Sequence, residues 1–289
     1  MRIAPGRRSG PPEPLPLPTV EGDGRIPRIL HQIHVGGPLP DKFAANVRQL
    51  REANPGWEYL FHDDAAAERL LADDYGPAMH ALYHSISPLY GAARADLLRY
   101  LILYRFGGVY LDLKSVAERP LDEVIAPEDS FVVTQWDNGP GEEHEGFGLL
   151  QYLSDVPGGE FLQWFIACAP GHPMMRAVIE RVTDILRAYD PIRDGVGRAV
   201  IRVTGPVPYT LAIAPLLSRC PHRFVRNHRA LGLRYSMASG MEHRELVGTR
   251  HYTRARHPIV DQPRSPLMKL VVRAGLEAKA FRRWLLGLG

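Results

Sequence analysis

Lysine, cysteine and long apolar runs are scarce in this sequence. Its 35 basic residues include only four lysines, and the rest are arginine; the lysines are Lys42, Lys114, Lys269 and Lys279. Two cysteines in 289 residues exclude a small disulfide-stabilised scaffold and suit a reducing compartment. No uninterrupted apolar stretch reaches the roughly 18 residues of a membrane-spanning helix. The arginines near the N-terminus are not followed by an apolar segment, so a secretory signal is not predicted.

The overall composition is typical of a globular protein. Hydrophobic residues make up 45% of the chain, charged residues 23%, and the net charge is only +3. These values exclude wholesale disorder, a fibrous repeat and a coiled coil, and they do not call for a nucleic-acid partner. We therefore expect a cytoplasmic protein.

The chain divides into three expected regions. Residues 1–25 contain six prolines and are predicted to be a disordered leader, because such a segment cannot bury a core. Residues 26–262 are predicted to form one domain. Residues 263–289 are predicted to form a basic amphipathic helix, in which 267–288 project apolar residues on one side and lysines and arginines on the other. This helix would pack on the domain or lie on an anionic membrane.

Strand and helix patterns alternate within the domain. Strands are predicted at 26–35 and 57–61, with a helix over 41–52, capped by Asp41, and another opened by Asp63. A long apolar helix is predicted at 89–106, where Gly107-Gly108 ends it before a strand at 109–113. This order predicts an α/β fold with a mixed central sheet flanked by helices.

Two polar pairs stand out in the apolar segment. Asp96 and Arg99 are three residues apart on one helix face, and Asp112 and Lys114 are two apart on one side of an extended chain. Because the glycine turn folds the strand back beside the helix, both pairs should converge at the strand's carboxyl end, where open α/β sheets bind ligands. Each pair alone fits a structural salt bridge. Together they favour a site, since charge in an apolar segment is costly unless it is used.

Five segments, taken in order, resemble glycosyltransferase family 32, the DXD sugar-binding glycosyltransferases, whose members include bacterial capsular polysaccharide synthesis enzymes. The segments are 26–32, 54–64, 94–115, 159–173 and 204–210. The resemblance covers most of residues 26–252. It implies a GT-A type nucleotide-sugar-binding (Rossmann-like) single domain and a retaining transfer of a sugar.

The resemblance also implies roles for individual residues. Asp96 and Arg99 would hold hydroxyls of the donor sugar, Tyr110 would lie near the nucleotide, and Asp112 would contact the donor or a metal. In the family, a second aspartate binds the Mn²⁺ or Mg²⁺ that bridges the diphosphate, but Lys114 stands at that position here. A lysine can itself neutralise part of the diphosphate charge. Either Lys114 reduces the need for a metal, or it points to solvent and another carboxylate completes the metal site.

Two histidines are further candidates by resemblance. His34 ends the first strand, where many relatives have a tryptophan near the nucleotide base; it would contact the base or have no ligand. His251 resembles a late histidine that approaches the metal or diphosphate, and otherwise it is a surface residue. His172 precedes a predicted helix and is expected to be a turn or packing residue.

The acceptor side is expected beyond the strand predicted at 131–136. Gln135, Trp136 and Asp137 would face the acceptor, although a buried core role is equally common for a tryptophan. Loop 138–148, rich in glycine and glutamate, is either a lid over the acceptor or a solvated charged loop.

The predicted function is a retaining glycosyltransferase that moves a hexose-type sugar from a nucleotide-sugar donor, a UDP-sugar before a GDP-sugar, to a glycan or lipid-linked acceptor in surface polysaccharide synthesis. The alternative is a non-catalytic nucleotide-sugar-binding relative. A metal-dependent hydrolase would need denser clustering than His62-Asp63-Asp64, which fits a strand end and helix cap. The expected location is the cytoplasm, at the inner face of the membrane if 267–288 bind it.

Overall fold

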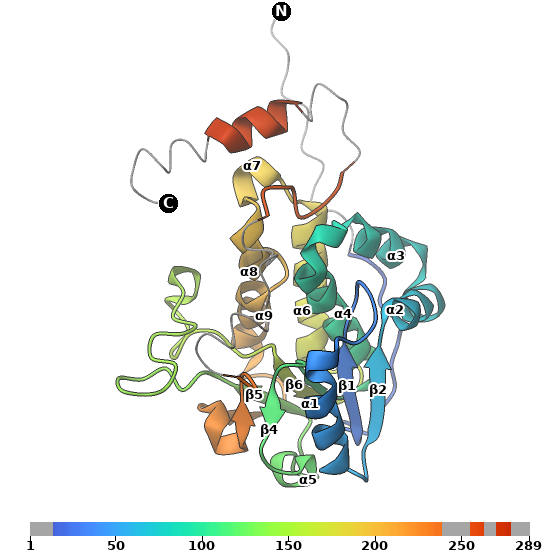
Figure 1. Ribbon diagram of the computed structural model, residues 1–289, viewed down its shortest axis with the longest axis vertical. Coiled ribbons are helices and arrows are strands. Elements are labelled where there is room, and N and C mark those ends of the chain that lie inside the picture. Colours follow the sequence, from blue (N-terminus) through green and yellow to red (C-terminus); the bar gives the residue numbers. More distant parts are fainter. Residues whose placement is uncertain (1–13, 239–254, 263–269, 279–289) are drawn as a thin grey trace, which may run out of the picture.

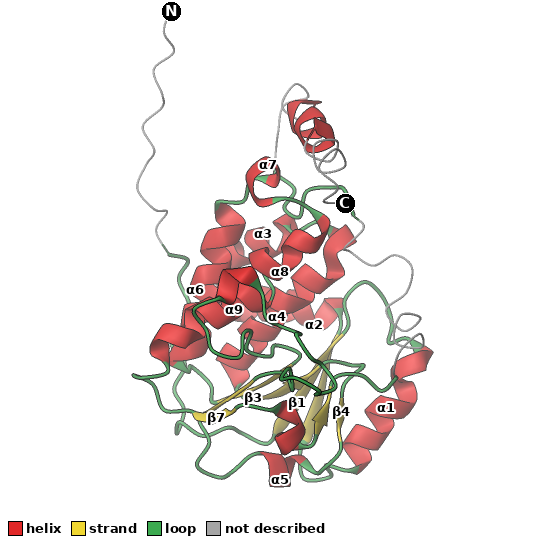
Figure 2. Ribbon diagram, turned by 90° about the vertical axis from the view of Figure 1, so that its left-hand side faces the viewer, coloured by secondary structure: helices red, strands yellow, loops and turns green. Residues whose placement is uncertain are grey.

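The computed structural model describes residues 14–238, 255–262 and 270–278. A central sheet lies at one end of the molecule, and most of the helices stand on one of its faces (Figures 1 and 2). The predicted α/β class, a mixed sheet flanked by helices, is confirmed.

The main sheet has six strands in the order β2-β1-β3-β6-β5-β7. β1 pairs in parallel with β2 and β3, and β5 pairs in parallel with β7, whereas β6 is antiparallel to both β3 and β5. A small second sheet pairs β4 with β8. The strands are β1 (Ile29–Ile33), β2 (Glu58–His62), β3 (Gly108–Leu111), β4 (Val116–Ala117), β5 (Phe131–Thr134), β6 (Phe165–Cys168), β7 (Arg223–Val225) and β8 (Leu233–Arg234).

The helices divide between the two faces of the sheet. α4 and α6 lie with α8 and α9 in the larger core, and α5 and part of α1 belong to a second core on the opposite face. The helices are α1 (Asp41–Glu52), α2 (Asp64–Leu70), α3 (Gly76–Ser85), α4 (Gly91–Phe106), α5 (Leu121–Val124), α6 (Pro173–Arg187), α7 (Pro191–Asp194), α8 (Val200–Val203) and α9 (Pro206–Ile213).

Alternation along β3 explains how one strand serves both cores. Val109 and Leu111 belong to the second core, and Tyr110 points into the larger one. Successive side chains of a strand face opposite sides. The ends of the elements differ from the predicted ends by a few residues. β1 is shorter than 26–35, and Asp41 is the first residue of α1 rather than its cap, because Pro40 occupies the N-cap position.

The turn between α4 and β3 depends on two glycines. Gly107 has φ of 66° and Gly108 has φ of 99°, and a Cβ atom on Gly108 would lie 2.5 Å from the carbonyl oxygen of Ile29. Such close approach of β1 to the turn is open only to glycine. The buried His31 connects β1 to this turn and to β2, since its Nε2 lies 2.8 Å from the Gly107 carbonyl oxygen and its Nδ1 lies 3.0 Å from Nε2 of His62.

The proline-rich leader differs from the prediction in its second half. Leu15, Leu17 and Val20 are packed against the larger core, and the Tyr104 hydroxyl donates to the Pro18 carbonyl at 3.2 Å. Residues 14–25 therefore lie on the domain, because the leucines and valine between the prolines find apolar partners there. Residues 1–13 of the predicted leader lie outside the described residues.

The structure shows the surroundings of two apolar stretches in the C-terminal half of the chain. Within Gly197–Leu216, an 18-residue window has a mean hydropathy of 1.2, enough by length and composition for a membrane span, but 67% of that window is buried inside the protein. Of the predicted C-terminal helix, 270–278 are described and are helical. Val272 is buried, and Gly275 lies beside Ile192 of α7. This part of the helix therefore packs on the domain; the rest of 263–289 lies outside the described residues.

Candidate active site

The candidate site lies where β3 ends. The strand stops at Leu111, and Asp112 to Lys114 form a turn in which the Ser115 amide donates to the Asp112 carbonyl at 2.9 Å. The prediction of an extended chain through residue 113 was therefore wrong. The turn still keeps Asp112 and Lys114 together, with Nζ of Lys114 3.5 Å from Oδ2 of Asp112.

Asp96, Arg99 and Asp112 form one charged cluster, as the glycine turn predicted. Arg99 Nη2 lies 3.0 Å from Oδ1 of Asp96, and its Nη1 lies 3.3 Å from Oδ1 of Asp112. Arg99 Nη1 also donates to the Gln163 carbonyl at 2.7 Å. The arginine of α4 thus joins the helix to the end of β3 and to the start of β6.

Tyr110 and Lys114 complete the surroundings of Asp112. The Tyr110 hydroxyl donates to Oδ1 of Asp112 at 2.6 Å, and its ring lies under the Arg99 guanidinium at 4.6 Å. Lys114 does not extend into solvent: its Nζ donates to the Tyr235 hydroxyl at 2.9 Å and lies 4.2 Å from the centre of that ring. Only 21% of the Lys114 side chain is exposed.

Exposure separates the cluster into two pairs. The side chains of Arg99 and Asp96 are 7% and 5% exposed, whereas Asp112 and Lys114 are 20% and 21% exposed. Asp96 uses its second oxygen to accept from the Thr204 hydroxyl at 2.8 Å. Asp112 and Lys114 are therefore the charges that are accessible to a ligand. Arg99, paired with the buried Asp96, contacts Asp112 from the protein interior.

Burial changes the ionisation of the inner pair. Burial raises the pKa of Asp96 to about 6, against the opposing effects of Arg99 and the Thr204 hydrogen bond. The neighbouring Tyr110 and the two carboxylates hold the pKa of Arg99 above its usual value in spite of its burial. Lys114 also has a raised pKa, because Tyr235 and Asp112 outweigh its burial. Both cations therefore remain charged at neutral pH.

The residues at the turn do not fit a divalent metal. Mn²⁺ and Mg²⁺ prefer carboxylate and other oxygen ligands. Here one oxygen of Asp112 already meets Arg99 and Tyr110, and the other faces the ammonium of Lys114. The position that resembles a second metal-binding aspartate therefore carries a positive charge. His251, the other predicted metal ligand, lies outside the described residues.

His34 lies at the same edge of the sheet as Asp112. It follows directly after β1, which is parallel to β3 with His31 opposite Tyr110. Its backbone amide donates to the His62 carbonyl at 3.0 Å, and partial burial lowers its pKa. Its predicted contact with a nucleotide base stays a prediction. His172 has the expected packing role, since it caps α6 by accepting from the Met174 amide at 3.2 Å.

The predicted acceptor side begins where β5 ends. Trp136 is buried and donates from Nε1 to Oε1 of Glu160 at 2.6 Å. Asp137 is buried as well, and Nδ1 of His144 lies 2.6 Å from its Oδ1. Loop 138–148 contains neither helix nor strand. The Asn138 side chain donates to the Phe147 carbonyl within the loop and to the Gly158 carbonyl beyond it.

Sequence reasoning missed several partners of the cluster. Tyr235 holds Lys114, Thr204 holds Asp96, and the Gln163 carbonyl accepts from Arg99. Thr204 and Tyr235 stand 108 and 121 residues away from the side chains they contact. Thr204 belongs to a segment that the resemblance singled out, but no local pattern marks Tyr235.

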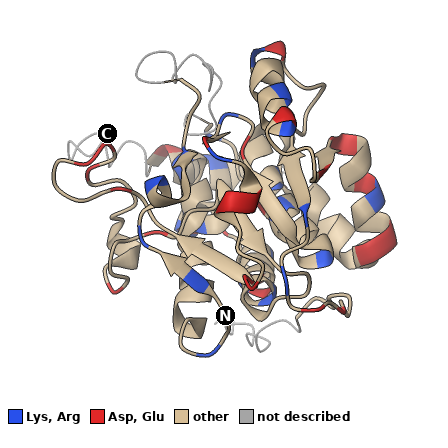
Figure 3. Ribbon diagram, turned by 90° about the horizontal axis from the view of Figure 1, so that it is seen from below, with Lys and Arg blue, Asp and Glu red and all other residues tan. Residues whose placement is uncertain are grey.

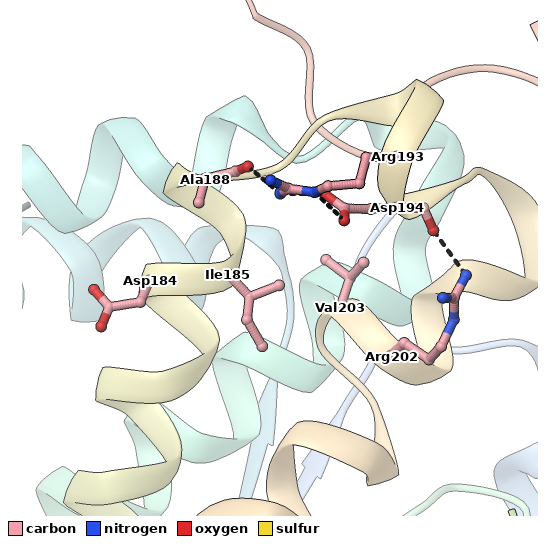
Figure 4. A pocket seen from close by; sticks show the side chains of 7 residues that line it. All are labelled: Asp184, Ile185, Ala188, Arg193, Asp194, Arg202 and Val203. Carbon is pink, nitrogen blue, oxygen red and sulfur yellow. Dashed lines mark hydrogen bonds and ion pairs between the residues drawn. The ribbon is translucent and has the colours of Figure 1, made fainter. Parts of the chain in front are cut away.

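A separate cavity lies outside this site. It has a volume of about 410 Å³ between α6, α7 and α8, at the end of the helical layer away from the sheet (Figures 1 and 4). Its arginines are already engaged, because Arg193 donates to the Ala188 carbonyl and Arg202 to the Asp194 carbonyl, each at 2.7 Å. Seen from below, acidic and basic residues are interspersed over the sheet end of the molecule (Figure 3).

Comparison with known proteins connects this geometry to a family. Residues 40–131 match the model of the glycosyltransferase sugar-binding region containing a DXD motif. Inositol phosphoceramide mannosyltransferase 3 of Schizosaccharomyces pombe is 35% identical over 100 residues, which are 35% of this chain and 27% of that protein. The initiation-specific alpha-1,6-mannosyltransferase of Candida albicans is 27% identical over 159 residues, 51% of this chain and 39% of that protein.

The chain spans less than half the length of these curated relatives. Among solved structures, a chain described as PaToxG glycosyltransferase aligns with a TM-score of 0.49 and 14% identity, over 80% of this chain and 87% of the other. The matched residues 40–131 include Asp96, Arg99, Tyr110, Asp112 and Lys114. The part of this chain that builds the charged cluster therefore lies within the segment that is similar to the sugar-binding region of the DXD glycosyltransferases.

Proposed function

We propose that this protein is a retaining glycosyltransferase that binds a nucleotide-sugar donor beyond the carboxyl end of β3. The charged cluster of Asp96, Arg99, Asp112 and Lys114 carries the proposal. Four charges meet there within an otherwise apolar region, and two of them, Asp112 and Lys114, remain partly exposed. Charged groups held in this way at the ligand-binding edge of an α/β sheet favour a site over a purely structural ion pair.

Lys114 has the central chemical role in the proposal. The bond to the sugar breaks as negative charge develops on the leaving diphosphate, and a fixed cation next to that charge stabilises the transition state. The ammonium of Lys114 is held in place by the hydroxyl and ring of Tyr235. In this proposal it supplies charge that a divalent metal supplies in relatives with a second aspartate.

Asp112 and the inner pair orient the donor. Asp112 keeps one oxygen toward Arg99 and Tyr110 and turns the other toward Lys114. Its exposed edge would accept hydrogen bonds from the ribose or sugar hydroxyls. Retention through front-face attack, assisted by the leaving phosphate, needs no covalent nucleophile.

The sugar and acceptor are the finer part of the proposal. Two relatives are named mannosyltransferases, so mannose is the first hexose to test, with both UDP and GDP as the nucleotide. A glycan or lipid-linked acceptor, as in surface polysaccharide synthesis, and a cytoplasmic location at the membrane face belong to the same proposal.

The test combines donor binding with turnover. A thermal-shift screen of UDP- and GDP-hexoses identifies the donor, because a ligand that binds only the folded state raises its melting temperature. Donor hydrolysis is then measured in EDTA and in Mn²⁺. Wild-type protein is expected to turn over in EDTA. Loss of all activity in EDTA with recovery in Mn²⁺ would disprove the role of Lys114 as the diphosphate cation.

Variants of Lys114 sharpen this test. Lys114→Met is expected to lower kcat about 10²-fold, the usual effect of removing one group that stabilises transition-state charge. Lys114→Asp is expected to become dependent on Mn²⁺. Lys42→Met, at an exposed lysine of α1, is the matched control and should leave kcat unchanged. Donor binding without turnover in wild-type protein would favour the non-catalytic alternative, which the substitution of the second aspartate by lysine motivates.

A further inference from the structure

A second cluster of polar side chains lies beyond β5. Asp137 follows that strand, His144 comes from loop 138–148, and His228 begins the short helical turn His228–Leu231. One potential ligand atom from each of the three side chains lies within 4.8 Å of the other two. Two neighbouring positions, Asp137 and His144, and the distant His228 thus bring two imidazoles and a carboxylate to one point.

His228 is the residue that points to a missing ligand. Its side chain is 0% exposed, and Nε2 has no hydrogen-bond partner among the residues that the structure describes. Its other nitrogen, Nδ1, lies 3.3 Å from the Gln135 carbonyl and 3.7 Å from Oδ1 of Asp137. A buried polar atom without a partner costs free energy. A histidine whose Nδ1–H is held by a carbonyl and whose Nε2 lone pair is free has the usual arrangement of a metal ligand.

The neighbouring residues provide the rest of such a site. His144 Nδ1 lies 2.6 Å from Oδ1 of Asp137, a carboxylate–histidine pair that fixes the orientation of the ring. Aromatic rings enclose the cluster: Trp136 lies 4.8 Å from His144, and Trp164 lies 5.3 Å from His228, between ring centres. An apolar enclosure of this kind strengthens the attraction between a cation and a carboxylate.

We propose that Asp137, His144 and His228 bind a divalent transition-metal cation of the Zn²⁺ class, which fastens loop 138–148 to the end of β5. Two imidazoles and one carboxylate are a ligand set that such ions accept, with a fourth position left for water or substrate. Ligands of a tetrahedral Zn²⁺ lie about 3.3 Å apart, given bond lengths near 2 Å. The present separations from Oδ1 of Asp137 are 2.6 Å to Nδ1 of His144 and 3.7 Å to Nδ1 of His228, so the side chains must rotate when a metal binds.

The site is distinct from the turn at Asp112, although the two are neighbours. Tyr235 forms the wall between them, because its ring lies 6.3 Å from that of His144 and its hydroxyl accepts from Lys114. A cation that holds the loop would therefore stabilise the aromatic wall beside the donor site. It would do so without touching the diphosphate.

A second histidine cluster on the surface must be removed before Zn²⁺ binding at the proposed site can be measured. Glu68 of α2 and His80 and His84 of α3 also lie within ligand distance of one another. Both histidines are already hydrogen-bonded to the two oxygens of Glu68, at 2.8 and 2.7 Å, and they are about 40% exposed. This cluster satisfies its own polar atoms, but it will compete for Zn²⁺ in solution.

The experiment is therefore made in full-length protein carrying His80→Gln and His84→Gln. After dialysis against chelator, Zn²⁺ is titrated by calorimetry. Co²⁺ is titrated with tryptophan fluorescence as the signal, because a paramagnetic ion next to Trp136 and Trp164 quenches them. We expect one equivalent of Zn²⁺ to bind. Adding His144→Gln, on the loop and so compatible with folding, should weaken binding about tenfold or more. His222→Gln, outside both clusters, should leave binding unchanged.

The opposite result is equally clear. Failure of the background protein to bind Zn²⁺, or binding unchanged by His144→Gln, would overturn the site. Whether the metal fastens loop 138–148 to the end of β5 is measured by proteolysis. Glu142, Glu143 and Glu145 make the loop a substrate for a glutamate-specific protease. Zn²⁺ should slow cleavage there in the background protein but not in the His144→Gln protein. Equal cleavage rates with and without Zn²⁺ would overturn that role.

The chelator arm of the Lys114 experiment is also run in the His144→Gln protein. A metal lost from this cluster is then not mistaken for a metal at Asp112. Zn²⁺ binding is measured without donor or turnover, so this proposal and the proposed function can fail independently.

Discussion

Single residues around Asp112 show how a charged site is kept inside an apolar region. Arg99 and Tyr110 share one oxygen of Asp112, while Lys114 faces the other. Asp96 balances Arg99 and is itself satisfied by Thr204. Removing one partner of such a buried pair leaves a charge uncompensated, which costs more than the pair itself contributes. The cluster is therefore expected to tolerate changes at its exposed rim better than at Asp96 or Arg99.

Glu160 allows a residue-scale prediction about pH. Burial raises the pKa of the Glu160 carboxyl to about 7 from its ordinary value of 4.5, although Trp136 donates to it. The folded protein therefore keeps a proton that the unfolded chain releases. The stability that this group contributes is fully present below about pH 4.5 and is lost as the pH rises through about 7.

Glu160→Gln keeps an oxygen acceptor for Trp136 and removes the titration. Between about pH 5 and pH 8, the free energy of unfolding of wild-type protein should fall by about 2–3 kcal/mol more than that of the variant. Urea unfolding at both pH values measures the difference. Glu123→Gln, at an exposed glutamate of α5, is the control. Parallel pH profiles for wild type and Glu160→Gln would contradict the prediction.

At the residue scale, the sequence predicted the near neighbours of the site but not the distant ones. Asp96, Arg99, Tyr110, Asp112 and Lys114 fall within one short segment, so helix and strand periodicity suffice to place them together. Tyr235 and Thr204 reach the same point only through the fold of the whole chain. The proposed metal site of Asp137, His144 and His228 was also not predictable from the sequence, because Asp137 and His228 have no spacing that relates them.

The elements around the site depend on the turn from α4 to β3. The helix ends at Phe106 and the strand begins at Gly108, so one residue reverses the chain. That reversal sets Arg99 of the helix beside Asp112, which directly follows the strand. The sequence predicted this reversal correctly, because two adjacent glycines after an apolar helix have few other uses.

Gly108→Ala tests this turn directly. A Cβ atom at this position would lie 2.5 Å from the Ile29 carbonyl oxygen, at a φ of 99° that alanine rarely adopts. We expect β1 and β3 to separate locally, at a cost of about 2–3 kcal/mol in the free energy of unfolding. Gly56→Ala, with no atom within 4 Å of the added Cβ, should change stability far less. Equal stability of the two variants in denaturant unfolding would show that the turn adapts.

Element boundaries were harder to predict than element types. β3 was expected to continue through Leu113, but it ends at Leu111 because the chain turns to form the hydrogen bond from the Ser115 amide to the Asp112 carbonyl. Asn46 of α1 stabilises that turn by donating to the carbonyls of Leu113 and Ser115 at 2.8 and 2.9 Å. Asn46, which is distant in the sequence, thus helps to set the end of the strand, and no local sequence pattern predicts this contact.

At the scale of the whole molecule, two cores lie on opposite faces of one sheet. The larger one contains α4 and α6, and it also receives the proline-rich segment that the sequence suggested would be disordered. Composition predicted the lack of regular structure in 14–25 correctly. It did not predict the packing, because a few leucines and a valine are enough to hold an extended segment on an apolar surface.

Leu15→Ser combined with Leu17→Ser tests whether that segment stabilises the domain. Both leucines are partly buried against the larger core, so the double variant should lose about 1–3 kcal/mol in the free energy of unfolding. Thr19→Ser, at an exposed position of the same segment, is the control. Urea unfolding that gives the same midpoint for the double variant and wild type would show that the segment adds nothing to stability.

The direction of β6 in the main sheet has a consequence for how this molecule can diversify. Because β6 runs against β5, the connection between them leaves the sheet and returns to it at the same edge, next to Asp112. Trp136, Phe161 and Trp164 of this connection are buried in the cores, whereas most of loop 138–148 is exposed. One half of the candidate site is thus fixed by β3 and α4, whereas exposed positions of the loop in the other half can change without shifting a strand.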